Sequence, residues 1–225
     1  MALSPVSLQA AIIDLDGTLV DTLGDFVVAL SATLAEFGLA PVDRGFVALT
    51  VGKGSEHLLR SALAHAGADA ALYDAAMASY QRHYRAINGR HSTVFPGVVD
   101  GLNRLAAQGL KLACLTNKPT AFAVALLQDK GLARYFDQVF GGDAFERRKP
   151  DPLPLLKTCA ALGSVPARTL MVGDSSNDAQ AARAAGCPVV LVSYGYNHGQ
   201  PVSEVDADAT IDRLDELVWP LASPR

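Results

Sequence analysis

Short apolar runs alternate with alanine-rich segments of helical spacing along much of the chain. Runs rich in Val, Ile and Leu predict six strands, at 9–16, 110–116, 137–143, 168–174, 188–194 and 207–211. Segments between them with helical spacing lie at 122–132, 152–163 and 177–186. The last two end at Gly163 and Gly186, which suits a helix C-terminus that needs a left-handed residue. The strands are continuously apolar, which is typical of a parallel sheet covered by helices on both faces.

Residues 22 to about 90 follow a different pattern. Stretches of helical spacing, with no strand pattern among them, lie at 21–40, 54–68 and 74–87. Short turns of Gly, Pro and Asp join these stretches. We therefore expect an α/β fold, in which a doubly wound, Rossmann-like parallel sheet core carries an inserted helical cap. The expected core domain comprises residues 1–20 and 91–225, and the expected cap domain comprises residues 21–90.

The composition is that of a folded chain and narrows the possible partners. Half of the 225 residues are apolar and 19% are charged, so the chain can bury a sizeable core. The formal net charge is −4 and no run of Lys or Arg is long enough to suggest a nucleic-acid surface, so we expect no nucleic-acid partner. No apolar stretch reaches the ~18 residues of a membrane span. The beginning of the chain also lacks the basic region of a signal peptide, and we expect a cytoplasmic location without membrane contact.

The three cysteines, Cys114, Cys159 and Cys187, are odd in number and widely spaced. This pattern fits neither a disulfide framework nor a zinc site. Isolated thiols of this kind are usually small buried side chains, which agrees with a reducing compartment.

Polar clusters follow four of the predicted strands. They are DLDGT (14–18), TNKP (116–119), RRKP (147–150) and GDSSND (173–178). In an open α/β sheet the ligand crevice lies beyond the carboxyl ends of the strands, so clusters that are distant in sequence can converge there.

Each cluster contains residue types that suit phosphate chemistry. Asp14 and Asp16 point to the same side, because strand residues two apart share a face. Thr116 supplies a hydroxyl beside free backbone N–H groups at a helix start, which suits phosphate oxygens. Asp174 and Asp178 lie one helical turn apart. Taken singly, these patterns also describe an acidic turn, a helix cap, a surface lysine or acids at a helix N-terminus. Their common placement at strand ends favours a shared site.

The four segments DLDGTLVD (14–21), TNKP (116–119), KPDP (149–152) and GDSSND (173–178) resemble, in this order, the motifs of the haloacid-dehalogenase-type phosphatase superfamily. The resemblance covers most of the chain and includes a helical cap after the first strand. Within the superfamily, the chain looks most like the bacterial phosphoglycolate phosphatases. The stretches that carry this similarity are 116–127, 140–143, 149–156, 173–188 and 193–197.

The resemblance implies a Mg²⁺-dependent phosphomonoester hydrolase that forms an aspartyl-phosphate. Its expected substrate is 2-phosphoglycolate, which gives glycolate and phosphate. Asp14 would be the nucleophile, and Asp16 would act as general acid and then as general base. Lys149 would offset negative charge on the nucleophile and the phosphate. Thr116 and Asn117 would bind the phosphoryl oxygens.

The same resemblance implies a metal site. Asp14, the carbonyl oxygen of Asp16 and Asp174 would bind Mg²⁺, and Asp178 would orient metal-bound water or Lys149. Oxygen ligands of this kind suit a hard cation. A divalent cation would also offset the repulsion between neighbouring carboxylates, about 4 kcal/mol for two unit charges 4 Å apart at an effective dielectric of about 20. We expect Asp21, the third aspartate of the first motif, to be structural and to fasten the connection to the cap.

The stretch TVGKGS (50–55) in the expected cap lacks the spacing of a nucleotide-binding P-loop. Its glycines and free N–H groups at a helix start suit a substrate carboxylate, and they suit a flexible turn equally well. Gly52 and Lys53 are therefore candidate specificity residues, together with His57 and Arg60.

Three other functions are consistent with parts of the sequence. The same chemistry could act on another small phosphorylated metabolite, such as a sugar phosphate, in a phosphatase or a phosphomutase. A receiver-like signalling domain also carries a phosphoaspartate on a doubly wound sheet, but such domains are shorter and have no helical cap. A catalytically silent binding protein is disfavoured, because every side chain that the resemblance requires is present.

Overall fold

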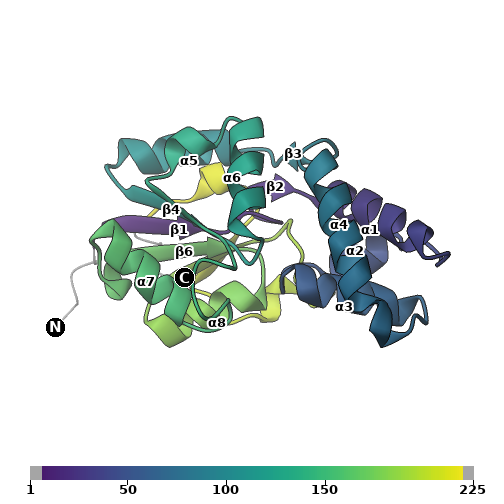
Figure 1. The fold of residues 1–225 in the computed structure, drawn as a ribbon. Coiled ribbons are helices and arrows are strands. Elements are labelled where there is room, and N and C mark those ends of the chain that lie inside the picture. The colour runs from purple at the N-terminus through teal and green to yellow at the C-terminus, as the bar shows by residue number, and fades with distance from the viewer. Residues whose placement is uncertain (1–6, 220–225) are drawn as a thin grey trace.

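The computed structural model describes residues 7–219. Its centre is a six-stranded sheet of order β5-β4-β1-β6-β7-β8 (Figure 1). The strands are β1 (Ala10–Ile13), β4 (Lys111–Leu115), β5 (Gln138–Phe140), β6 (Thr169–Gly173), β7 (Val189–Val192) and β8 (Ala209–Ile211). Every neighbouring pair in the sheet is parallel. The order runs outward from β1 in both directions, which confirms the predicted doubly wound α/β fold.

Helices cover both faces of this sheet (Figure 1). Those packed on one face are α5 (Val98–Ala107) and α6 (Thr120–Asp129), and those on the other are α7 (Leu153–Leu162) and α8 (Ser176–Ala185). The central strand shows why the strands are continuously apolar. Ala11 and Ile13 of β1 belong to the core beneath α5 and α6, whereas Ala10 and Ile12 belong to the core beneath α7 and α8. Both sides of β1 are therefore buried.

A helical insertion follows the first strand and lies beyond one end of the sheet (Figure 1). Its helices are α1 (Leu23–Glu36), α2 (Arg44–Thr50), α3 (Ser55–His65) and α4 (Tyr73–Ile87). The chain enters it through β2 (Val20–Asp21) and leaves it through β3 (Thr93–Val94), and these two strands pair antiparallel. The insertion was predicted. The boundaries proposed for the core domain (1–20 and 91–225) and the cap domain (21–90) stay a prediction, and residues 1–6 and 220–225 lie outside the described part.

A buried aspartate ties the two connections of the insertion together. Asp25 of α1 accepts hydrogen bonds from the backbone N–H groups of Gly89 and His91, each at 2.7 Å, and from the hydroxyl of Ser92. Its side chain is completely buried. One carboxylate of α1 therefore holds the segment that leads from α4 back to the sheet.

Asp21 lies at the other connection. It accepts a hydrogen bond of 2.5 Å from the hydroxyl of Tyr196, forms an ion pair of 2.6 Å with Arg44, and caps the N–H of Leu23. These contacts place Asp21 at the entrance to the insertion and away from the cluster of carboxylates described below.

Some elements were not predicted. Helix α2 has only seven residues, too few for a clear apolar period. Helix α5 contains Gly101, which lowers helix propensity by about 1 kcal/mol relative to alanine. The structure explains this glycine, because a Cβ at this position would lie 2.6 Å from the side chain of Leu214. Leu214 belongs to one of the short 3₁₀ helices, which are Ala70–Leu72, Ala133–Tyr135, Pro166–Arg168, Val202–Glu204 and Leu214–Glu216.

Several smaller expectations are confirmed. Gly163 and Gly186 end α7 and α8 in the left-handed conformation. Cys114, Cys159 and Cys187 are buried and free. Within residues 7–219, no helix combines the length and the apolar character that crossing a membrane requires.

Candidate active site

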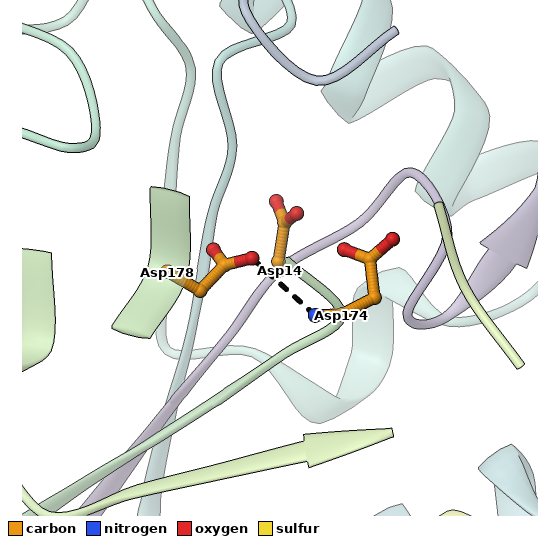
Figure 2. A group of neighbouring side chains, drawn as sticks. All are labelled: Asp14, Asp174 and Asp178. Atoms are coloured by element: carbon orange, nitrogen blue, oxygen red, sulfur yellow. Dashed lines mark hydrogen bonds between the residues drawn. The ribbon is translucent and has the colours of Figure 1, made fainter. Parts of the chain in front are cut away.

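Four aspartates gather at the carboxyl ends of two neighbouring parallel strands. Asp14 and Asp16 follow β1, Asp174 follows β6, and Asp178 lies in the first turn of α8. Asp14, Asp174 and Asp178 each offer a carboxylate oxygen, and these oxygens lie within 4.8 Å of one another (Figure 2). All three side chains are buried. The sheet therefore brings together acidic residues that are up to 164 positions apart in the sequence.

Burial changes the protonation of this cluster. Burial raises the pKa of Asp14 to about 7. The positive charge of Lys149 partly opposes this rise, and the negative charges of Asp178 and Asp16 add to it. The pKa of Asp174 is also raised well above its ordinary value, first by burial and then by the charges of Asp178 and Asp14. The cluster thus contains more negative charge than the neighbouring protein groups offset.

Lys149 is the cation within this cluster. Its Nζ lies 2.9 Å from Asp14 Oδ1, 2.6 Å from Asp178 Oδ1 and 2.9 Å from the carbonyl oxygen of Leu115. Burial alone lowers the pKa of Lys149, but the two carboxylates outweigh burial and hold that pKa above its usual value. Lys149 therefore remains charged and is fixed beside Asp14, and its expected role of offsetting charge on a nucleophile and a phosphate stays a prediction.

The donor atoms fit a metal ion at Asp14 and Asp174. Asp14 Oδ1 is buried and accepts no hydrogen bond, with Lys149 as its ion-pair partner. Asp174 is oriented by the backbone N–H of Tyr196, 2.6 Å from Oδ2, and by the hydroxyl of Thr18, 3.3 Å from Oδ1. Carboxylate oxygens held in this way, with lone pairs to spare, suit a hard divalent cation.

Asp178 is more fully engaged than the other two. Its Oδ1 faces Lys149, and its Oδ2 accepts hydrogen bonds from the N–H and the hydroxyl of Ser175 at 3.2 and 2.9 Å. The N–H of Asp174 also lies 3.3 Å from Oδ2 (Figure 2). Asp178 therefore caps the start of α8 and holds Lys149, and its expected task of orienting metal-bound water or Lys149 stays a prediction.

The turn after β1 leaves room for the carboxylate of Asp174 to lie against its backbone. Gly17 has a φ of +88°, which side chains rarely adopt. A Cβ at Gly17 would lie 2.1 Å from Asp174 Oδ2, inside the contact distance of the two atoms. Both the turn and the position of Asp174 thus require glycine here.

The carboxylate of Asp16 points away from the cluster and pairs with Lys118. The Nζ of Lys118 lies 2.9 and 3.2 Å from the two oxygens of Asp16, and the lysine side chain is 2% exposed. The predicted metal contact of Asp16 concerned its carbonyl oxygen, and this contact stays a prediction. Lys118 received no role from the sequence, although it belongs to the TNKP segment, because a single lysine in a sequence carries no sign of burial.

Thr116 and Asn117 lie beside these carboxylates at the end of β4. The hydroxyl of Thr116 accepts a hydrogen bond of 3.2 Å from the N–H of Lys118. The side chain of Asn117 is occupied by protein groups. Its Nδ2 donates to the carbonyl oxygens of Gly52 at 2.9 Å and Lys149 at 2.8 Å, and its Oδ1 accepts from the N–H of Lys149 at 3.1 Å. Asn117 therefore joins the insertion to the loop that carries Lys149, and its predicted contact with phosphate stays a prediction.

A pocket opens between this cluster and the insertion and contains about 370 Å³ of space without atoms, part of it open to solvent. The residues that line it are Asp14, Asp16, Phe26, Val51, Gly52, Gly54, Ser55, Leu58, Thr116, Asn117 and Lys118.

Of the predicted specificity residues, Gly52 lines this pocket. Lys53 and His57 are exposed, and Arg60 stacks on the ring of Tyr73, 3.6 Å from its centroid.

Known proteins share this sequence and this fold. Residues 11–192 match the family model described as haloacid dehalogenase-like hydrolase. A protein of Thiobacillus denitrificans named phosphoglycolate phosphatase is 46% identical over 215 residues, which are 94% of this chain and 95% of the relative. A plasmid-encoded phosphoglycolate phosphatase of Cupriavidus necator is 45% identical over 219 residues, 96% of this chain and 94% of that protein.

A solved structure of a related protein has the same fold. The crystal structure of a "predicted phosphoglycolate phosphatase" from Haemophilus somnus superposes with a TM-score of 0.90 and 31% sequence identity, over 93% of this chain and 96% of the other. The motif order, the doubly wound sheet and these matches agree with one another. The chain belongs to the haloacid dehalogenase-like hydrolase family.

Proposed function

We propose that this protein is a phosphatase that hydrolyses 2-phosphoglycolate to glycolate and phosphate. The observation that carries the proposal is the buried cluster in which Asp14 lies beside Lys149 and Asp174 at the edge of a small pocket. The names of the relatives at 46% and 45% identity support the choice of substrate.

In the first half of the reaction, a carboxylate oxygen of Asp14 attacks phosphorus and the bond from phosphorus to the ester oxygen breaks. The electron pair of that bond stays on the glycolate oxygen, and Asp16 transfers a proton to it. Lys149 attracts both the Asp14 carboxylate and the phosphoryl oxygens, so it reduces the repulsion between two anions that must meet. The product of this step is an aspartyl-phosphate on Asp14.

In the second half, water attacks the same phosphorus and Asp16 accepts a proton from this water. The bond between phosphorus and the Asp14 oxygen breaks, which frees the Asp14 carboxylate and releases phosphate. Throughout both steps, the hydroxyl of Thr116 and the backbone N–H of Asn117 would hold phosphoryl oxygens. One pair of aspartates thus supplies the nucleophile and the acid/base group.

Asp14, Asp174 and the carbonyl oxygen of Asp16 would hold a divalent cation, and the all-oxygen donor set suits Mg²⁺. When bound, this ion supplies positive charge that stabilises the phosphoryl oxygens during transfer. Asp178 keeps Lys149 in place beside the ion site.

The test is a comparison of phosphate release from a panel of phosphorylated metabolites in the presence of Mg²⁺. We expect 2-phosphoglycolate to give the highest kcat/KM, and we expect Asp14→Asn to reduce kcat by at least about 1,000-fold for every substrate. The circular dichroism spectrum of the variant should match that of the wild type. Equal activity of Asp14→Asn would exclude Asp14 as the nucleophile, and a higher kcat/KM for a sugar phosphate would exclude the proposed substrate.

A further inference from the structure

Lys118 is a buried cation at the wall of the active-site pocket that the proposed mechanism does not use. Its side chain is 2% exposed, and its Nζ is within 3.2 Å of both oxygens of Asp16. Two aromatic rings from the insertion cover the ammonium group. Its Nζ lies 4.4 Å from the ring centroid of Phe26 and 4.8 Å from that of Tyr84.

Stability alone gives a weak reason for this arrangement. Removing two charges from water costs several kcal/mol per ion, and their attraction often does no more than offset this cost. The faces of Phe26 and Tyr84 favour a cation by their quadrupoles, which keeps the ammonium group in place without neutralising it. Among the described residues that line the pocket, Lys118 carries the single positive charge, against the two negative charges of Asp14 and Asp16. A cation in such a place is suited to an anionic part of the substrate.

The position of Asp16 shows which part of the substrate this is. In the proposed mechanism Asp16 transfers a proton to the ester oxygen, so that oxygen lies next to the Asp16 carboxylate during the reaction. In 2-phosphoglycolate one methylene carbon bears both the ester oxygen and the carboxylate. The substrate carboxylate must therefore lie within one carbon of the group that Asp16 contacts, and Lys118 Nζ is already at hydrogen-bond distance from Asp16.

We propose that Lys118 binds the substrate carboxylate and selects phosphoesters of short 2-hydroxy acids. This inference rests on the proposed function. Phe26, Val51 and Leu58 form the apolar side of the pocket, and the rings of Phe26 and Tyr84 cover the ammonium group of Lys118. These apolar groups exclude water from the ion pair, which strengthens it. The insertion thus contributes to specificity through the rings that seat Lys118, whereas the exposed Lys53 lies outside the residues that line the pocket.

A pair of substrates separates this role from simple support of Asp16. The first is 2-phosphoglycolate, and the second is 2-hydroxyethyl phosphate, which has a hydroxymethyl group where the first has the carboxylate. We expect Lys118→Met to lower kcat/KM for 2-phosphoglycolate by about 100-fold, mostly through KM. The reason is that the substrate carboxylate loses Lys118, its partner in a buried charge pair. For 2-hydroxyethyl phosphate we expect a loss of less than about fivefold. Equal losses for both substrates would overturn the proposal and leave Lys118 as a residue that positions Asp16.

Three further variants support the test, the first of them against a folding defect. Lys118→Gln keeps a group that donates to Asp16 but removes the charge, so it should show the same selective loss if Lys118→Met does not fold. Lys118→Arg keeps the charge and should retain part of the preference for 2-phosphoglycolate. Lys157→Met removes an exposed lysine of α7 and should leave kcat/KM unchanged for both substrates.

The wild type itself distinguishes this inference from the proposed function. If it hydrolyses both esters equally well and Asp14→Asn abolishes both activities, the phosphatase mechanism holds and the role of Lys118 in carboxylate binding is wrong. If the wild type hydrolyses neither ester, the proposed function and this inference fail together.

Discussion

Asp14 and Asp16 are two positions apart, and each is paired with a different lysine. Lys149 Nζ lies 2.9 Å from Asp14 Oδ1, and Lys118 Nζ lies 2.9 Å from Asp16 Oδ1. The two lysines come from different loops, after β5 and after β4. Repulsion between the neighbouring carboxylates is thereby reduced by two separate cations, and each aspartate has surroundings of its own. Two residues with the same side chain can then perform different chemical tasks.

The raised pKa of Asp14 predicts how stability depends on pH when metal is absent. The ordinary value is 3.8 and the value in the folded protein is about 7. Between these two values the folded state binds more protons than the unfolded state, so the free energy of unfolding decreases as pH rises. In EDTA we expect the Tm to fall by at least about 5 °C between about pH 5 and about pH 8. Thermal unfolding followed by circular dichroism measures this change.

Millimolar Mg²⁺ should reverse the trend, because a metal ion binds ionised carboxylates and stabilises the folded state that holds it. The increase in Tm that Mg²⁺ causes should therefore grow with pH. Asp14→Asn is the control, since it removes the titrating group, and its Tm in EDTA should depend less on pH than that of the wild type. A wild-type Tm in EDTA that rises with pH would contradict the assignment of a raised pKa.

At the scale of elements, the turn after β1 and the start of α8 enclose the cluster. The turn contains Gly17, whose missing Cβ leaves room for Asp174, and Asp178 caps α8 while it holds Lys149. Because β1 and β6 are parallel neighbours, their carboxyl ends bring Asp14 and Asp174 together without any long loop. The clustered aspartates thus lie on short, buried connections.

The contribution of the turn can be tested by Gly17→Ala, with Gly109→Ala as a matched control. Both glycines have positive φ, +88° and +75°, so each alanine costs roughly 1–2 kcal/mol of backbone strain. Only at Gly17 does the new Cβ also meet Asp174, whereas at Gly109 it meets open space. We expect Gly17→Ala to lower kcat by at least about tenfold and Gly109→Ala to leave it unchanged, measured as phosphate release. Equal kcat values for the two variants would show that the displacement of Asp174 has no catalytic effect.

The strands and the crowding of aspartates at their ends could be predicted because their signals are local. Continuous apolar runs identified all strands of the main sheet, and the motifs placed Asp14 and Asp174 at two strand ends. The i, i+2 spacing did not reveal that the carboxylate of Asp16 pairs with Lys118. The presence of helix α5 and the burial of Lys118 could not be predicted from local signals. Gly101 lowers the helix propensity of α5. A glycine is required there because Leu214, more than 100 residues later in the chain, packs against this position. Lys118 becomes distinct from a surface lysine only when Phe26 and Tyr84 fold over it.

At the scale of the whole molecule, the insertion and the sheet share aromatic packing. The apolar core of the insertion includes Phe122 of α6 and Tyr196 from the loop after β7. The ring of Phe122 meets the ring of Tyr84 edge-on with centroids 5.0 Å apart. By contrast, the ion pair between Arg148 and Glu56 is exposed and contributes little to holding the two parts together. Shared apolar burial is the stronger connection.

This packing predicts that the insertion and the sheet unfold together. We expect a single transition in calorimetry, and we expect Phe122→Ala to shift all of it downward by about 5–15 °C, because loss of a large core side chain costs about 3–5 kcal/mol. Val165→Ala, at an exposed position of similar apolar character, should shift the transition by no more than about 2 °C. Two separate transitions, or a shift confined to one part of a split transition, would show that the insertion unfolds on its own.

The pairing of β2 with β3 has a consequence for how this protein can be altered. Asp21 and Thr93 face each other in that pair, and Asp25 fastens the returning segment beside it. The four helices therefore leave and rejoin the sheet through one narrow neck whose two strands are already hydrogen-bonded. We expect that a helical segment of another relative can replace this one at the neck without a change in the register of the six strands, if it also packs on Phe122 and Tyr196. Such chimaeras would change the rings that seat Lys118.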